Sequence, residues 1–300
     1  ACSKCDFKQY CLSELPETNI MTPPRMHQSR IASLQSNDIL DARDIPEDFP
    51  LTESQERYVN TIKTGEPHID VNAIREALKE LEYPIAFTDF ESYSYSLPIV
   101  PGAKPWEQIP FQFSIHGMSW EGAVFHHDYL FTGNLEDTDV RLEFLQHLLD
   151  VLEDVDGSVV VYNANFEKTI LKRLAERYPE YEERIQRVID RIWDLELIFK
   201  NHYVDPRFLG KTKLKVVGPI LKPECDYGQL EIDNGGDATR EWAEMMKKQA
   251  EKSKSPEQML EIVSIGDNLL RYCAMDTLVM VKLFMFLSVL VNKNQQQISL

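Results

Sequence analysis

The chain has 300 residues, of which 43% are hydrophobic and 10% aromatic, and a formal net charge of −17 at neutral pH. This length and apolar content support one large or two modest folded domains and exclude a chain that is disordered throughout. The acidic balance argues against tight, nonspecific binding along duplex nucleic acid, which needs a basic surface. It does not exclude a nuclease, because such an enzyme needs carboxylates for its metal ions, and the ions themselves bring positive charge.

The sequence predicts neither a signal peptide nor a membrane span. The N-terminus is polar and cysteine-rich, unlike a secretion signal. The most apolar stretch, Leu278 to Val291, is interrupted by Lys282 and Ser288, which indicates a buried helix. We therefore expect a cytoplasmic protein without a membrane partner.

The first 82 residues divide into a cysteine cluster and a helical connector. Residues 1–12 contain three of the five cysteines, and this odd total argues against a disulfide framework. Residues 13–82 are polar and helical in pattern, with a helix–turn–helix pair expected over 30–44. A further helix is expected over 70–81, with Asp70 as its N-cap. The alternative is that this region is a small helical hairpin that binds nucleic acid.

From residue 83 onward, strands and helices are predicted in an order typical of an α/β fold. Three strands come first, and the second and third are joined by a tight turn at Glu121-Gly122. A later, short apolar strand is expected at the centre of the sheet. The expected strands are 83–92, 111–120, 123–131 and 158–162; the expected helices are 137–153, 166–177, 180–192, 239–252 and 267–291; and 201–237 is expected to be loop-rich. This order resembles an RNase H-like mixed five-stranded sheet flanked by helices, preceded by the helical connector.

Two acidic residues share one side of the first strand. Asp89 and Glu91 are two residues apart, and side chains in a strand alternate between its faces. Two adjacent carboxylates repel each other, and a divalent cation such as Mg²⁺ or Mn²⁺ commonly compensates this repulsion. Taken alone, the pair could equally be a strand end that emerges into solvent.

Two further acids stand at helical positions. Glu167 follows the short apolar strand and the turn Asn163-Ala164-Asn165-Phe166, which places it in the first turn of a helix. Asp276 lies in the last helix, one turn after Tyr272 and close to an apolar seam, where an acid needs a partner or a metal. Each of these could alone be an ordinary helix residue.

Together the three motifs resemble the DEDD exonuclease superfamily, which includes DnaQ-like, polymerase-linked and RNase D-type enzymes. That superfamily has D-x-E on its first strand, an N-x-x-F-D turn after the fourth strand, and Y-x-x-x-D or H-x-x-x-x-D in its last helix. The chain matches this pattern over about residues 83–292, in the tyrosine subtype, with Glu167 in place of the usual aspartate. Residues 293–300 are expected to form a tail. The resemblance implies that two Mg²⁺ or Mn²⁺ ions are held by Asp89, Glu91, Glu167 and Asp276.

A closer resemblance is carried by the segments 83–91, 109–116 and 270–277. They are similar to a bacterial and archaeal family known only as a domain of unknown function. Its members often carry a RecB-type PD-(D/E)XK nuclease domain before the DEDD-like domain. The resemblance implies such a domain as a partner in the full-length chain. Gln112 and His116 are interpreted as substrate or structural residues.

The N-terminal cysteines, Cys2, Cys5 and Cys11, resemble the C-terminal end of an iron–sulfur staple in RecB-type nucleases. In those proteins a distant upstream cysteine completes a four-thiolate [4Fe–4S] site. We expect the cluster only in the full-length protein, and we interpret residues 1–12 as the remnant of that staple, which could capture zinc or form a stub. Cys225 and Cys273 are expected to be core or near-site thiols.

The resemblance predicts a metal-dependent 3′→5′ exonuclease that hydrolyses phosphodiester bonds of single-stranded DNA, with Tyr272 orienting the attacking water. Two alternatives stay open: an RNA 3′→5′ exonuclease, and a catalytically weak module that positions a fused nuclease. The residues expected to contact the substrate are Phe90, Tyr93 and Tyr95, which could stack on bases, and Gln112, Asn163 and Lys213. A core role is the alternative for Phe90.

Overall fold

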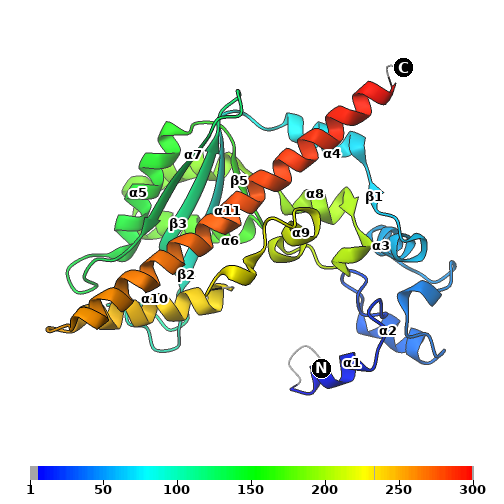
Figure 1. Ribbon diagram of the computed structural model, residues 1–300, viewed down its shortest axis with the longest axis horizontal. Coiled ribbons are helices and arrows are strands. Elements are labelled where there is room, and N and C mark those ends of the chain that lie inside the picture. The colour runs from blue at the N-terminus through cyan, green and yellow to red at the C-terminus, as the bar shows by residue number, and fades with distance from the viewer. Residues whose placement is uncertain (1–5, 233, 299–300) are drawn as a thin grey trace.

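The computed structural model of the chain describes residues 6–232 and 234–298, and its centre is a five-stranded sheet (Figure 1). The strand order is β4-β3-β2-β5-β6. Strands β2, β3 and β4 are antiparallel, whereas β5 is parallel to both β2 and β6. The strands are β2 (Ile85–Tyr93), β3 (Ile109–Met118), β4 (Val124–Leu130), β5 (Val159–Val161) and β6 (Ile192–Asp194). The predicted fold class, a mixed five-stranded sheet flanked by helices, is confirmed.

Helices cover both faces of the sheet, and the alternation along β2 assigns its side chains to the two layers. Ala86 and Phe90 face the layer of α5, α6 and α7, whereas Ile85 and Phe87 pack against α11. The helices of the first layer are α5 (Val140–Asp154), α6 (Asn165–Arg177) and α7 (Glu182–Asp190). The second layer holds α4 (Val71–Lys79), α8 (Glu196–Asn201), α9 (Leu214–Leu221) and α11 (Pro256–Ile298). Since β2 is covered on both sides, most of its side chains are buried.

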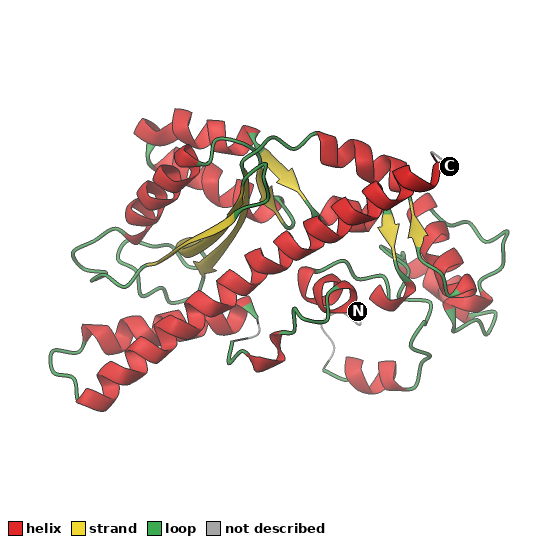
Figure 2. Cartoon of the chain, turned by 45° about the horizontal axis from the view of Figure 1, so that its top comes forward, coloured by secondary structure: helices red, strands yellow, loops and turns green. Residues whose placement is uncertain are grey.

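Helix α11 is the longest element and crosses the sheet diagonally (Figure 1). It begins before the predicted helix at 267–291 and continues through most of the predicted tail. Its first turns lie beside α10 (Gly235–Ala250) as a helical hairpin (Figure 2). By length and composition α11 is long and apolar enough to cross a membrane, and half of its most apolar window is buried inside the fold.

The N-terminal region has a small core of its own and is joined to the main body by a short two-stranded sheet. Strand β1 (His68–Ile69) pairs antiparallel with β7 (Tyr203–Val204). Asp70 caps α4 by accepting the Ala73 backbone N–H at 2.9 Å, which confirms the predicted N-cap. The other helices are α1 (Lys8–Ser13), α2 (Gln28–Gln35) and α3 (Glu53–Thr64), and the core is formed by Ile20, Leu34, Ala42, Ile45, Tyr58, Val59 and Ile62. This region therefore docks on the main body and is more than a helical tether.

Three predictions for the element pattern are wrong. The second helix of the pair at 30–44 is a single 3-10 turn, Ala42–Asp44, because Asp41 caps it and Pro46 follows closely. The helix expected over 180–192 ends at Asp190, and the next residues form β6. The segment 201–237 contains β7, α9 and the short 3-10 helices Pro206–Phe208 and Tyr227–Gln229. Strands of two or three residues are too short to show a period in the sequence.

The predicted iron–sulfur residues lie at the edge of what the structure describes. Cys2 and Cys5 lie outside the described residues, and Cys11 lies in α1. The predictions for these three cysteines therefore stay predictions.

Candidate metal centre

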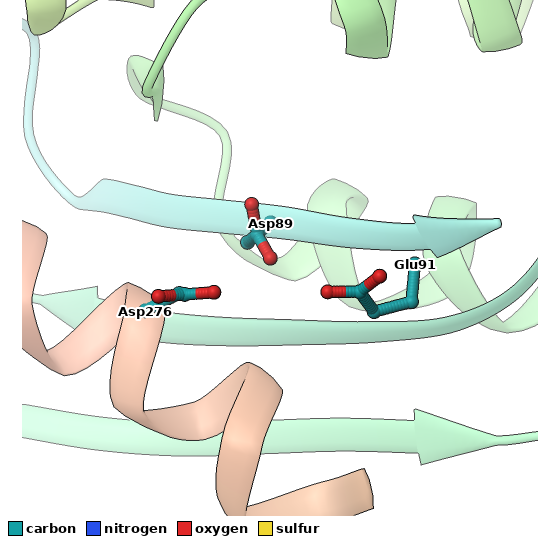
Figure 3. Close-up of side chains that lie close together, drawn as sticks. All are labelled: Asp89, Glu91 and Asp276. Atoms are coloured by element: carbon teal, nitrogen blue, oxygen red, sulfur yellow. The ribbon is translucent and has the colours of Figure 1, made fainter. Parts of the chain in front are cut away.

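Three carboxylates from β2 and α11 meet on one face of the sheet. Asp89 and Glu91 point from β2 toward α11, and Asp276 points back from α11 toward the strand (Figure 3). One carboxylate oxygen from each residue lies within 4.8 Å of the other two. Glu91 and Asp276 are buried and Asp89 is half-buried. Two elements that are far apart in the sequence thus bring three acids together, as the motif spacing predicts.

The environment of these acids opposes their ionisation. Burial, followed by the charge on Asp276, raises the pKa of Asp89 well above its usual value. Burial and the charge on Asp89 do the same to Glu91. Burial also raises the pKa of Asp276, although the Lys215 ammonium opposes this shift. Buried carboxylates that repel one another gain most from a divalent cation.

Glu167 lies beside this cluster but outside the set of three oxygens that approach within 4.8 Å. It is buried, and within the part of the chain that the structure describes, its Oε2 atom has no hydrogen-bond partner. Burial, followed by the charge on Asp89, raises the pKa of Glu167 well above its usual value. An orphaned buried carboxylate oxygen next to three other acids fits a metal ligand and fits an uncharged core residue poorly.

The turn that delivers Glu167 is held by a residue that the sequence analysis missed. Asp194, at the end of β6, accepts the backbone N–H groups of Asn163 at 3.0 Å and Ala164 at 3.2 Å. Asn163 itself has a positive φ of 73°, a conformation that asparagine tolerates better than most residues. The missed signal was the short strand β6, because its last residue braces the neighbouring turn.

Tyr272 lies at the edge of the candidate metal centre, beside Lys215 and Tyr227, for which the sequence predicted no role there. The Lys215 ammonium donates a hydrogen bond to the Tyr272 hydroxyl and lies 4.1 Å from the centre of its ring. The Tyr227 hydroxyl donates to Oδ1 of Asp276 at 2.6 Å. Burial and the nearby carboxylates raise the pKa of both tyrosines, so both hydroxyls stay protonated. Lys215 also lies close enough to the acids for its charge to oppose the rise in the pKa of Asp276.

Two of the predicted base-stacking residues are core residues. The Phe90 ring is buried and makes an edge contact with Phe144 at 5.3 Å between centroids. Tyr93 is 1% exposed, and its hydroxyl accepts the Ile99 backbone N–H at 3.0 Å. The predicted stacking role is therefore wrong for Phe90 and Tyr93, because a strand covered on both faces has no free side. Tyr95 is exposed and stacks on Tyr93, so its stacking role stays a prediction.

Gln112 and His116, on β3, have structural partners on α11. Gln112 is fully buried, and its Nε2 donates to the Leu269 carbonyl oxygen at 2.7 Å. A substrate-binding role for Gln112 is therefore wrong, because its side chain is inaccessible. His116 Nδ1 lies 2.7 Å from the Thr277 hydroxyl, directly after Asp276. Both side chains tie β3 to the helix that carries Asp276, which is the structural alternative predicted for them.

The remaining predicted residues are two exposed polar residues and two buried cysteines. Asn163 and Lys213 are exposed, and their contact with a substrate stays a prediction. Cys273 is a near-site thiol whose Sγ lies 3.6 Å from Oδ2 of Asp89, and Cys225 is buried in the core. Both cysteines are thus found in the settings expected of them.

The donor set fits a hard divalent cation. It offers carboxylate oxygens only, from Asp89, Glu91 and Asp276, with a further unpartnered oxygen on Glu167. Oxygen-only sets select Mg²⁺, Mn²⁺ or Ca²⁺ over metals that prefer sulfur or nitrogen. With Tyr272 and Lys215 at its edge, such a centre could bind and hydrolyse a phosphate ester.

Comparisons with known proteins give one family model and two relatives, none with a described function. Residues 86–213 match the family model described as Domain of unknown function (DUF2779). It is 25% identical over 207 residues to the uncharacterized protein UU173 of Ureaplasma parvum serovar 3, covering 63% of this chain and 30% of that protein. It is 24% identical over 248 residues to the uncharacterized protein MG366 of Mycoplasma genitalium, covering 74% of this chain and 35% of that protein. The matched part thus spans about a third of each relative. No solved structure matches the chain.

Proposed function

We propose that this domain is a metal-dependent 3′→5′ exonuclease of the DEDD type, with a tyrosine in its last helix, that acts on single-stranded DNA. The observation that carries the proposal is the approach of oxygens from Asp89, Glu91 and Asp276 to within 4.8 Å of one another, from the first sheet strand and the last helix. The orphaned oxygen of Glu167 supports it independently. The family match and the relatives describe no activity, so the proposal rests on the geometry and on the motif resemblance.

Asp89, Glu91 and Asp276 would hold two Mg²⁺ or Mn²⁺ ions, with Glu167 as a further ligand. When bound, the ions supply a Lewis acid that lowers the pKa of water and stabilises the leaving 3′ oxygen. Tyr272 accepts a hydrogen bond from Lys215, and its own hydroxyl bonds to Asp276 and lowers the pKa of that carboxyl. With an ion held by Asp276, the Tyr272 proton would turn to the attacking water and orient it. A tyrosine's ordinary pKa near 10 makes it a poor base at neutral pH, and burial raises the pKa of Tyr272 further.

The direct test is hydrolysis of a 3′-labelled single strand by the parent protein and by Asp89→Ala. The parent should release mononucleotides from the 3′ end only when Mg²⁺ or Mn²⁺ is present. Asp89→Ala should fall to background, because the alanine removes a charge that holds the ions. Asp154→Ala, on an exposed carboxylate of α5, is the matched control and should keep the parent rate.

DNA and RNA strands of the same sequence should be assayed in parallel, since contacts to a 2′-hydroxyl decide between these substrates. Faster cleavage of RNA would assign the protein to the RNA exonucleases. Metal-dependent strand binding without cleavage would instead support the catalytically weak binding module. A parent protein that neither binds Mg²⁺ or Mn²⁺ nor cleaves either strand would disprove the proposal.

A further inference from the structure

A polar pocket of about 450 Å³ lies between the N-terminal region and the main body. Arg25 and Tyr58 contribute to one wall. Asn163, Lys211 and Thr212 contribute to the other. Asn163 begins the turn that carries Glu167, and the Thr212 carbonyl accepts the hydroxyl of Tyr162 at the end of β5. The pocket thus adjoins the elements that build the metal centre without containing its acids.

The two walls are fixed to each other by backbone contacts. Strand β1 pairs with β7, and the Asp70 N–H donates to the His202 carbonyl oxygen at 2.8 Å. Gly210, with a φ of +71°, lies so close to Thr22 that a Cβ atom would overlap the Thr22 carbonyl oxygen. The pocket is therefore built by specific docking of the N-terminal region.

The segment that lines the second wall is basic in an otherwise acidic chain. From Pro206 to Pro223 there are five lysines and arginines and no acid, whereas the whole chain has 49 acids and 32 lysines and arginines. Lys211 lies in the pocket and Lys215 contacts Tyr272 at the metal centre. They are four positions apart in the sequence, a distance of at most about 14 Å along the chain. Cations thus extend from the metal centre into the pocket.

Among the described residues, the pocket is lined by three cations, Arg25, Lys200 and Lys211, and by two acids, Asp194 and Asp205. Asp205 is paired with Arg207 at 2.7 Å, and Asp194 accepts two backbone N–H groups, so the acids offset the cations only in part. Arg25 and Lys211 are both exposed, from opposite walls. Exposed cations flanked by amide and hydroxyl groups are the groups that bind phosphates in nucleic-acid interfaces.

We propose that the N-terminal region and the segment 206–215 form a binding groove for the phosphate backbone of single-stranded nucleic acid, and that this groove leads the strand to the metal centre. The inference rests on the proposed nuclease function and adds a role for the N-terminal region. A single strand fits better than a duplex, because the chain as a whole is strongly acidic and would repel the dense charge of a duplex.

The test measures strand binding by fluorescence anisotropy with a labelled 20-nucleotide thymidine strand, in EDTA so that the strand stays intact. Arg25→Glu and Lys211→Glu should each weaken binding by about tenfold at low salt. Each should also reduce the slope of the logarithm of the binding constant against the logarithm of the salt concentration by about one, the effect of losing one phosphate contact. Arg187→Glu is the control, because it reverses a charge that is 55% exposed on α7, in the helical layer on the other face of the sheet. It should bind like the parent. Equal strand binding by all three variants would disprove the proposal that this groove binds the strand.

A second substrate separates this inference from the proposed function. The p-nitrophenyl ester of thymidine 5′-phosphate reaches the acids without occupying the groove. Arg25→Glu should reduce cleavage of the 20-nucleotide strand at least tenfold more than cleavage of the ester. An equal loss on both substrates would place Arg25 at the metal centre and overturn the groove. If the parent binds the strand through Arg25 and Lys211 but cleaves neither substrate, the proposed nuclease function is wrong, whereas the proposed strand-binding groove is supported.

Discussion

At the residue scale, the contacts of Tyr272 bear most directly on the proposed chemistry, because they decide how its hydroxyl group is oriented. A phenol hydroxyl can accept one hydrogen bond while donating another. The Lys215 ammonium donates a hydrogen bond to the Tyr272 hydroxyl oxygen, and its charge also lies over the Tyr272 ring as a cation–π contact. The hydroxyl is thus held in position, with its proton directed at the Asp276 carboxylate. The same lysine is 5.2 Å from the Tyr227 ring, so one cation orders both tyrosines beside Asp276.

Tyr272→Phe tests the orienting role directly. The variant loses one hydroxyl and keeps the ring, so the helix should pack as before. Strand cleavage should fall by about 10²–10⁴-fold, the usual contribution of a positioned proton-transfer or orienting group. Mg²⁺ or Mn²⁺ affinity, titrated separately, should stay close to that of the parent. Cleavage at the parent rate would show that Tyr272 is only a core residue and would refute the tyrosine-type assignment.

The carboxylate cluster should cost stability when no metal is bound. The pKa of Glu91 is raised in the folded protein, so the fold favours the protonated carboxyl group. The stability that this group contributes is fully present below its unfolded pKa near 4.5, and it is lost as the pH rises through the folded pKa. At pH 7 in EDTA, Glu91→Gln removes this repulsion. Its melting temperature should rise by a few degrees, which corresponds to about 1 kcal/mol in a protein of this size.

The same variant should lose the stabilisation that metal gives to the parent. Ligand binding to the folded state raises its stability, so Mg²⁺ should raise the parent's melting temperature and have a smaller effect on Glu91→Gln. Glu183→Gln, a carboxylate that is 92% exposed on α7, is the control and should follow the parent in both conditions. An apo Glu91→Gln protein that melts below the parent would show that Glu91 is stabilising in the charged form.

At the element scale, a polar network fixes α11 against the sheet next to Asp276. The Thr277 hydroxyl lies 2.8 Å from Ser114 Oγ and 2.7 Å from His116 Nδ1. His126 on β4 lies 2.9 Å from the same serine and stacks on His116 at 4.3 Å. A helix that slipped by one turn would leave these buried groups unpaired. The network therefore sets the position of Asp276 relative to Asp89 on the neighbouring strand.

This network predicts a loss of stability in acid. Burial, followed by the charge on His126, lowers the pKa of His116 to about 4. A lowered folded value means that stability is complete above the unfolded value near 6.5 and is lost as pH falls toward 4. The shift corresponds to at most about 3 kcal/mol, and to less because the ring is partly exposed.

His116→Gln should show a smaller loss, because glutamine can still bond Thr277 but cannot be protonated in this range. The measurement is the free energy of unfolding in urea at pH 7 and at pH 4.5 for both proteins. The difference between the two pH values should be smaller in the variant by about 1–2 kcal/mol. The same pH dependence in both proteins would show that His116 stays neutral in acid or is too exposed to matter.

The sequence predicted the long periodic elements and the acids that they carry. Strands β2 to β4 and helices α5 and α6 show clear periods, and the three motifs lie on or next to such elements. It missed β6, β7 and α9, because two- or three-residue strands and an eight-residue helix containing Pro219 have too few residues for a pattern. The supporting residues Asp194 and Lys215 lie on missed elements, so their roles were missed with them. Phe90 and Tyr93 were misassigned because alternation alone does not reveal burial on both faces.

At the scale of the whole molecule, the N-terminal region and the main body depend on each other. The region's small core reaches Val204 of β7, and β1 extends the same contact as a two-stranded sheet. The loop that follows β7 then passes against Thr22 at Gly210 and continues into α9, which carries Lys215. A change in docking should therefore be transmitted to the basic segment at the metal centre.

Gly210→Ala tests this docking, and Gly102→Ala is its matched control. Both glycines have a positive φ, +71° and +69°, where an L-residue costs about 1–2 kcal/mol. A Cβ at Gly102 has nothing within 4 Å, whereas a Cβ at Gly210 overlaps the Thr22 carbonyl oxygen. Gly102→Ala should therefore lower the free energy of unfolding by the backbone cost alone. Gly210→Ala should lose a further 1–3 kcal/mol or so, as overpacking usually costs.

The second readout distinguishes undocking from general loss of stability. Under native conditions trypsin should cut the N-terminal region of Gly210→Ala faster than that of Gly102→Ala, because separation from Thr22 exposes it. Binding of the 20-nucleotide strand should weaken in Gly210→Ala as the groove opens, whereas cleavage of the thymidine ester should be affected less. If the two alanine variants unfold, resist trypsin and bind the strand alike, the N-terminal region is held by β1 and its core contacts alone, and the approach of Gly210 to Thr22 contributes nothing to docking.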